Sequence, residues 1–158
     1  MTLARAIPVT ALLAAVACGA EPPPSSAPPA SSTTLAPTTG STTVNIRLTV
    51  DGRVVHATLN DSAAARDFAI LLPLTLDLSD FHETERISDL PRRLSTDGAP
   101  ESAEPKAGDL AFYAPWGNLA IYYRDAPRAN GVVVLGRLAD GGADVLATAD
   151  RVTIEPTP

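Results

Sequence analysis

Alternating apolar and polar positions over residues 44–59 predict a β-hairpin. Asp51-Gly52 lies at the centre of this stretch, and Asp-Gly is a strong signal for a two-residue turn. Pairing about this turn sets Leu48 opposite Val55, on a face that is apolar along its length. The other face is polar and includes His56, which we therefore interpret as a surface histidine.

A second hairpin is predicted within residues 108–125, which hold the chain's single tryptophan and all three tyrosines. With Trp116-Gly117 as the tip, one face is wholly apolar and the other carries a charge pair, as in a ribbon that is packed on one side only. We expect this hairpin at the centre of a β core. The register pairs Asp109 with Arg124, Ala111 with Tyr122, Tyr113 with Ala120, Leu110 with Tyr123, Phe112 with Ile121 and Ala114 with Leu119.

The rest of residues 44–155 supplies further short elements. A helix is expected over residues 62–72, capped by Asn60 or Asp61 and ended by Pro73. Further expected elements are a strand over 75–78, a nearly continuous apolar and therefore central strand over 131–138, a helical turn or two within 140–150, and a closing strand over 151–155. The fold class predicted is mainly β: a small barrel with one or two short helices.

The N-terminal residues 1–17 carry one positive charge, Arg5, followed by an apolar run too short to span a bilayer as a helix. Such a run is typical of a secretory signal. It ends at Cys18, the only cysteine in the chain, and this arrangement resembles a bacterial lipoprotein signal, in which the cysteine is lipidated. The alternative is a soluble secreted protein with an incidental cysteine.

Residues 18–43 follow this signal, and from Gly19 onward they contain six prolines and eleven serines or threonines. Such a composition cannot bury enough apolar surface to offset its ordering entropy. We interpret the stretch as a disordered tether that reaches at most about 75 Å. It would hold a domain of residues 44–155 at the extracytoplasmic face of a cell membrane, anchored through lipid only.

The chain has a formal net charge of −6. An acidic domain is repelled by nucleic acid and by anionic lipid, so we expect neither as a direct partner. The predicted domain contains no cysteine, so its stability must come from an ordinary core, for which its length is sufficient. We expect it to be a monomer.

Candidate chemistry is concentrated in the polar segment of residues 79–96, which Pro91 interrupts. His82-Glu83 has no second histidine at a useful spacing, so a metal site is not expected. Ser95 near Asp97 likewise has no histidine in the arrangement of a nucleophilic triad. We expect no metal and no cofactor.

Three stretches resemble the cyclophilins. The segment AARDFAIL at residues 64–71, placed after the first hairpin, is similar to the cyclophilin helix, and residues 134–138 and 142–146 are similar to its closing motifs. The stretches ARDFAILLPLTL, ISDLPRRLST and GDLAFYAPWGNLAIYY are together similar to bacterial cyclophilin-like proteins of unassigned function. The resemblance implies an eight-stranded closed barrel with helical plugs.

Cyclophilins bind proline in an outer-face groove with an arginine, so the resemblance also implies candidate groove residues. Arg86-Ile87 stands where the family's arginine motif lies, although Phe81-His82-Glu83 also matches that motif and would place an acid there. Tyr122 falls near a groove phenylalanine. Three groove positions differ from the family: Val132 replaces the histidine, Pro127 lies near the tryptophan, and Ala120 replaces a glutamine.

The candidate groove residues are therefore Arg86, Tyr113, Trp116 and Tyr122. The alternative is structural: the two tyrosines are diagonal cross-strand partners, Trp116 covers a barrel end, and Arg86 is solvated. Exposed aromatic residues on one face favour a binding patch. The first hypothesis is a non-catalytic module for a peptide or small apolar ligand, the second a peptidyl-prolyl isomerase, and the third a structural or partner-docking envelope lipoprotein.

Overall fold

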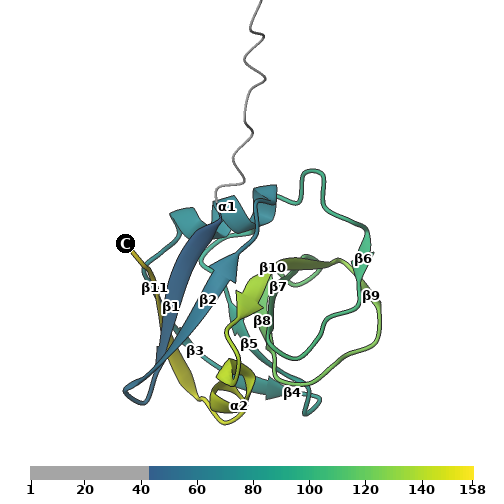
Figure 1. Ribbon diagram of the computed structural model, residues 1–158. Helices are drawn as coiled ribbons and strands as arrows, with labels where there is room; N and C mark the ends of the chain where they lie inside the picture. The colour runs from purple at the N-terminus through teal and green to yellow at the C-terminus, as the bar shows by residue number, and fades with distance from the viewer. Residues whose placement is uncertain (1–42) are drawn as a thin grey trace, which may run out of the picture. The chain divides into compact units, whose positions relative to one another are not determined.

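Nine antiparallel strands form one sheet that curls into a nearly closed barrel in the computed structural model, which describes residues 43–158 (Figure 1). The strand order is β3-β11-β1-β2-β10-β7-β8-β5-β4, and β6 and β9 form a separate two-stranded ribbon. The mainly β class is confirmed, with nine strands in the barrel sheet instead of eight. The strands are β1 (Val44–Val50), β2 (Arg53–Leu59), β3 (Leu74–Asp77), β4 (Ser79–Phe81), β5 (Glu85–Asp89), β6 (Ser102–Ala103), β7 (Asp109–Tyr113), β8 (Asn118–Tyr122), β9 (Ala129–Asn130), β10 (Val132–Leu138) and β11 (Arg151–Pro156).

The first hairpin has the predicted register. Leu48 lies opposite Val55, and Asp51 and Gly52 form the turn with φ angles of 48° and 77°. Positive φ at both central residues is what a two-residue hairpin turn requires. The apolar face lies in the core, and His56 lies on the exposed face, opposite Arg47.

The predicted register of the second hairpin is wrong by two residues. Phe112 lies opposite Leu119 and Ala111 opposite Ala120, around a four-residue turn at residues 114–117. Proline has no N–H for the ladder, so pairing through Pro115 is disfavoured, and the Gly117 N–H closes the turn on the Tyr113 carbonyl at 2.8 Å. Because the shift is even, each residue keeps its predicted face.

Both faces of this hairpin are buried, which corrects the expectation of a one-sided ribbon. The β6–β9 ribbon and its flanking loops cover the outer face, where Ala103, Ala126 and Ala129 pack against a second apolar cluster. Asp109 on this face is only 7% exposed, and it pairs with Arg137 at 2.6 Å instead of with Arg124. One face of the hairpin therefore lies at the centre of the core, and the other face lies beneath the β6–β9 ribbon and its flanking loops.

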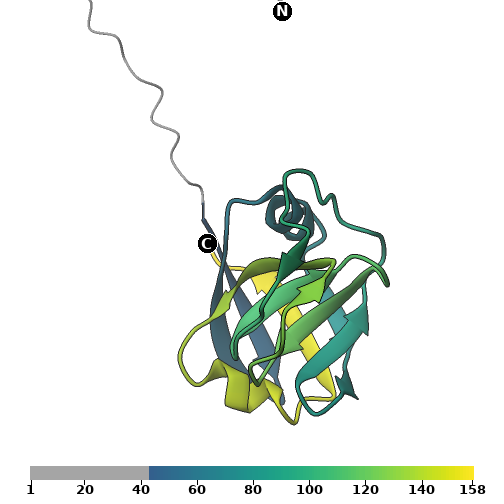
Figure 2. The same ribbon diagram turned by 90° about the vertical axis from the view of Figure 1, so that its right-hand side faces the viewer.

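Two short helices lie at opposite ends of the barrel, α1 (Ala63–Ile70) and α2 (Gly142–Leu146) (Figures 1 and 2). The cap of α1 is Ser62, whose hydroxyl accepts from the Ala65 N–H at 3.1 Å, so the expected cap at Asn60 or Asp61 is wrong. Asn60 instead joins the helix entry to β10, because its side-chain amide donates to the Val134 carbonyl at 2.8 Å.

The β4–β5 hairpin was not predicted, because its strands are short and polar. Its turn contains two non-glycine residues at positive φ, His82 at 54° and Glu83 at 53°. Asp80 supports the turn by accepting from the Glu83 N–H at 3.1 Å. This hairpin extends the sheet beyond β8 and turns His82 toward the outer face of the barrel.

β10 has the predicted central position, since it pairs with β2 on one side and with β7 on the other. Residues 1–17, Cys18 and the predicted tether lie outside the described residues, apart from Thr43. Among residues 43–158, neither helix has the length and apolar character needed to cross a membrane.

Candidate functional site

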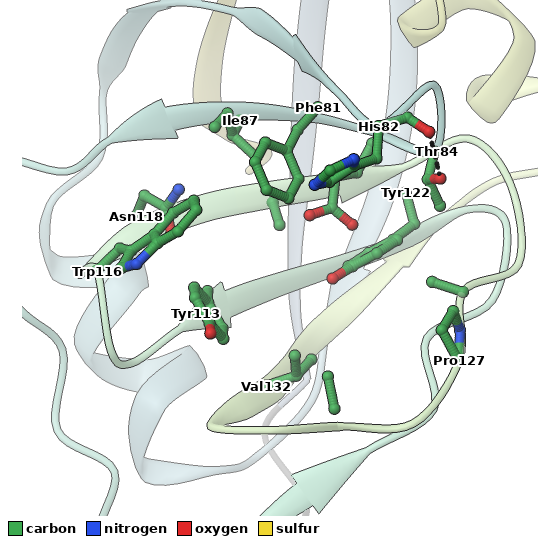
Figure 3. A pocket seen from close by; sticks show the side chains of 14 residues that line it. Phe81, His82, Thr84, Ile87, Tyr113, Trp116, Asn118, Tyr122, Pro127 and Val132 are labelled. Carbon is green, nitrogen blue, oxygen red and sulfur yellow. Dashed lines mark hydrogen bonds between the residues drawn. The ribbon is translucent and has the colours of Figure 1, made fainter.

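A pocket of about 330 Å³ opens on the outer face of the barrel, over strands β5, β8, β7 and β10 (Figure 3). Fourteen residues line it, and they come from these strands, from β4 and the β4–β5 turn, from the turn after β7, and from β9 and the loop that leads into it. Trp116 and Tyr113 lie on one side of the pocket and Pro127 lies on the other (Figure 3). Segments that are distant in the sequence thus meet around one cavity.

The floor of the pocket is apolar, and its depth follows from strand register. Ala120 lies opposite Ala111 on β7 and opposite Ile87 on β5. The small side chains of Ala111 and Ala120 lie between Tyr113 and Tyr122. The two tyrosine rings are therefore not diagonal cross-strand partners, and space remains between them. Ala111, Ala120, Tyr122 and Val132 form one buried cluster beneath this space.

Aromatic rings form one wall. The Trp116 ring lies 5.3 Å from the Phe81 ring and 5.3 Å from the Tyr113 ring, both in edge-to-face geometry. Phe81 also contacts the His82 ring, at 4.1 Å. Trp116 remains 56% exposed although it makes both contacts. An exposed indole held by two neighbouring rings is a preformed apolar surface for a ligand.

The turn that carries Trp116 is held by two neighbours. Arg93 donates to the Ala114 carbonyl and, at 3.1 Å, to the Pro115 carbonyl. Gly131 lies against the Pro115 ring at a φ of 79°, where an added Cβ would come within 2.6 Å of that ring. Only glycine fits this close approach, so the position of the turn is tightly constrained.

The segment that supplies Arg93 is itself tied to α1. Asp67 accepts from both terminal nitrogens of Arg92, at 2.6 and 2.7 Å, and from the Ser95 N–H at 2.9 Å. The hydrogen bond from Arg92, followed by that from Ser95, lowers the pKa of Asp67 to about 2. A bidentate pair with a backbone bond fixes residues 92–95, and with them the base of the Trp116 turn.

Glu85 is the one carboxylate among residues 43–158 that lines the pocket. Burial raises its pKa, while a hydrogen bond with Tyr122 and the charge of His82 oppose this shift. Burial followed by the Glu85 charge raises the pKa of Tyr122, which therefore stays protonated at neutral pH. In the described part of the chain, no Arg or Lys lines the pocket.

Asn118 supplies an unpaired acceptor at the base of the pocket. It is 3% exposed, and its Oδ1 has no hydrogen-bond partner among the described residues. A buried carbonyl oxygen without a donor is unfavourable by about 1–3 kcal/mol. Residue 118 lies on the same strand face as Ala120 and Tyr122, so the acceptor belongs to the pocket side of the sheet.

Arg86 lies away from the pocket. Across the β5–β8 ladder it is opposite Ile121, which is in the core, whereas Glu85 is opposite Tyr122. The Arg86 side chain is 14% exposed and donates to the Ala147 carbonyl at the end of α2, from Nε at 2.8 Å and from a terminal nitrogen at 2.5 Å. It therefore joins α2 to the barrel.

The structure thus brings together Tyr113, Trp116 and Tyr122 and leaves out the fourth candidate, Arg86. The three positions at which the sequence differs from the cyclophilin groove, Ala120, Pro127 and Val132, all line the pocket as well. Several other lining residues were not among the candidates, and four of them carry aromatic, charged or amide side chains. They are Phe81, His82, Glu85 and Asn118.

A signal for some of these missed residues was present in the sequence. The match of Phe81-His82-Glu83 to the cyclophilin arginine motif pointed to Phe81, His82 and the β4–β5 turn, but the acid that it implied, Glu83, does not line the pocket. Within residues 43–158, no three His, Cys, Asp or Glu side chains gather closely enough to hold a metal ion.

Comparisons with known proteins agree with the fold. The profile described as "Cyclophilin-like family" matches residues 48–155. The solution structure of a hypothetical protein from Archaeoglobus fulgidus is similar, with a TM-score of 0.51 and 17% sequence identity, over 74% of this chain and 97% of that chain. At this identity the structural similarity concerns the fold alone. No curated protein matches the chain significantly.

Substituting Asp67→Asn is expected to lower the free energy of unfolding by about 1 kcal/mol at pH 7, because the charge-assisted pair with Arg92 is lost. The carboxylate's folded pKa of about 2 lies below its ordinary value of 3.8. The ionised carboxylate therefore stabilises the folded state above pH 4, and this stabilisation is lost as the pH falls toward 2. Urea unfolding of both proteins at pH 7, 4 and 2 measures this difference.

Asp77→Asn is the matched control, because Asp77 also pairs with an arginine at 2.6 Å, but both side chains are well exposed, at 77% and 68%. Little change is expected there. A loss for Asp67→Asn that is as large at pH 2 as at pH 7 would contradict the ion-pair explanation.

Proposed function

Because this chain belongs to the cyclophilin-like family, we propose that residues 44–155 form a non-catalytic module that binds a peptide or a small apolar ligand. The observation that carries the proposal is the outer-face pocket, with an apolar floor and a wall of aromatic rings. Ligand sites are typically concave, mainly apolar and equipped with a few polar groups. Glu85 and Asn118 are the polar groups of this pocket.

Binding would gain most from the aromatic wall. Trp116 is 56% exposed, and a ligand that covers its ring removes apolar surface from water. The wall is already assembled without a ligand, since Trp116 contacts Phe81 and Tyr113 and its turn is held by Arg93. Little ordering is then required on binding, which favours affinity.

The absence of an Arg or Lys among the lining residues, within the part of the chain that the structure describes, favours binding over catalysis. Prolyl isomerisation in the cyclophilins uses an arginine whose donor groups favour a twisted amide. The residue at the matching position is Arg86, which lies on the core side of β5. Its guanidinium group donates hydrogen bonds to the Ala147 carbonyl. The pocket offers Glu85 instead, a carboxylate that accepts hydrogen bonds when it is ionised.

Substituting Tyr113→Ala is expected to weaken binding about tenfold, because one ring of the wall is removed. Trp116 is the chain's only tryptophan, so its fluorescence reports occupancy directly. Titration of the full chain with short apolar peptides and with 2-phenylethanol measures the affinity. His56→Ala, at an exposed position on β2, is the control and should leave the affinity unchanged. Absence of any saturable change in fluorescence would contradict the proposal.

Isomerase activity is the second candidate, favoured by the coincidence of the pocket with the groove positions that the cyclophilin resemblance implies. We expect no acceleration of the isomerisation of an Ala-Pro peptide, even at high protein concentration, because no Arg or Lys lines the pocket. The uncatalysed exchange takes tens to hundreds of seconds, so weak catalysis would be visible. Acceleration that disappears in Tyr122→Ala would make the protein an isomerase.

Lipid anchoring at Cys18 is the proposed means of localisation, with the domain at the extracytoplasmic face of the membrane. It is supported by the apolar run before this cysteine and by the Pro-, Ser- and Thr-rich stretch after it. In a bacterial host that lipidates exported proteins, the full chain is expected to incorporate labelled palmitate and to fractionate with membranes. Cys18→Ser should lose both properties, and a membrane-bound, unlabelled Cys18→Ser protein would contradict the anchor.

A further inference from the structure

We propose that the pocket recognises an ammonium group carried on a small apolar body. This inference rests on the proposed binding function and specifies the class of ligand. Four features of the pocket lead to it: a carboxylate that hydrogen-bonds to Tyr122 but has no Arg or Lys partner among residues 43–158, aromatic rings, an unsatisfied acceptor, and a limited volume with an apolar floor.

The carboxylate is Glu85. Its side chain lies on the pocket side of β5, because residue 85 is opposite Tyr122 across the ladder. No Lys or Arg within residues 43–158 forms an ion pair with it, and the only cationic partner acting on it is His82. Burial raises its pKa, which means that the ionised form is destabilised by its surroundings. A cation in the pocket would restore the missing stabilisation.

The aromatic wall suits the same kind of ligand. Trp116 meets Phe81 and Tyr113 with interplanar angles of 87° and 82°, so the ring planes are nearly perpendicular, and all three rings line the pocket. Ring faces are electronegative and attract cations, and several rings at large angles form a partial cage. Trp is the strongest of these cation acceptors.

Two polar side chains of the pocket, those of Asn118 and Glu85, carry hydrogen-bond acceptors that a donor group on a ligand would satisfy. Asn118 Oδ1 is buried and has no donor among the described residues. Glu85, when ionised, also accepts hydrogen bonds only. An ammonium group supplies up to three donors and a positive charge, whereas a carboxylate or phosphate would supply neither. No Arg or Lys lines the pocket to receive such an anion.

The remainder of the ligand must be apolar and small. The floor consists of Ala120, Ile87 and Val132, which offer no polar side-chain atoms. The volume of about 330 Å³ lies near the lower limit for ligand pockets. A primary amine on one aromatic or branched aliphatic group fits this description, and so does the free N-terminus of a peptide that begins with an apolar residue.

Three probes with one aromatic body test the inference at pH 7: 2-phenylethylamine, which is a cation, 2-phenylethanol, which is neutral, and 3-phenylpropanoate, which is an anion. Trp116 fluorescence of the full chain gives each dissociation constant. The amine is expected to bind at least about tenfold more tightly than the alcohol, and the anion most weakly. In Glu85→Gln the advantage of the amine over the alcohol should fall to about threefold or less.

Glu83→Gln is the matched control, because it removes the same charge two positions away, from an exposed residue that does not line the pocket. It should keep the preference for the amine. Equal affinities for the amine and the alcohol, or a preference that survives in Glu85→Gln, would overturn the inference while leaving a binding module. No binding of any probe would overturn the binding function as well.

A peptide pair separates the two sources of an ammonium group. The tripeptide Phe-Gly-Gly amide is compared with its N-acetylated form in the same assay. Tighter binding of the free peptide than of 2-phenylethylamine would make a peptide N-terminus the ligand, and weaker binding would make it a free amine. Acetylated peptide that binds as tightly as the free peptide would overturn the inference.

Discussion

The end of the β7–β8 ladder at Pro115 is the constraint on which the pocket depends. Because proline cannot donate to the ladder, pairing stops at Tyr113, and residues 114–117 form a four-residue turn. The Ala114 N–H is then used outside the hairpin, where it donates to the Gly131 carbonyl at 2.8 Å. The hairpin is thereby tied to the start of β10, and Trp116 is presented at the tip of the turn, above the outer face of the sheet.

The resulting register determines the shape of the floor. In the register first predicted, Ala111 would lie opposite Tyr122 and Tyr113 opposite Ala120, which sets the two tyrosines diagonally adjacent and leaves little space between them. In the observed register an alanine pair, Ala111 and Ala120, separates them. A difference of two residues keeps every side chain on its face, yet it changes a packed pair of rings into two walls of a cavity.

The fold was predictable wherever local pattern and turn chemistry agreed. The turn signal at Asp51-Gly52 predicted the correct register of the first hairpin. The apolar run of β10 correctly indicated a strand with neighbours on both sides. The β4–β5 hairpin was not predictable, because short polar strands at a sheet edge carry little periodicity and its turn holds non-glycine residues at positive φ. The burial of the outer face was missed because the cover comes from two distant loops whose pairing through β6 and β9 leaves no local signal.

The sequence predicted Tyr113, Trp116 and Tyr122 in the candidate site, but it did not predict which charged residue lines the pocket. The reason is the alternation of side chains along β5. Glu85 and Arg86 are neighbours in sequence, so strand geometry sends one to the pocket and the other to the core side. The ladder with β8 decides which, since Glu85 is opposite Tyr122 and Arg86 opposite Ile121. The resemblance to the cyclophilin arginine motif offered Arg86 or Glu83 for this position, and neither of them lines the pocket. The ladder therefore places a carboxylate on the pocket side of β5 and a guanidinium group on the core side.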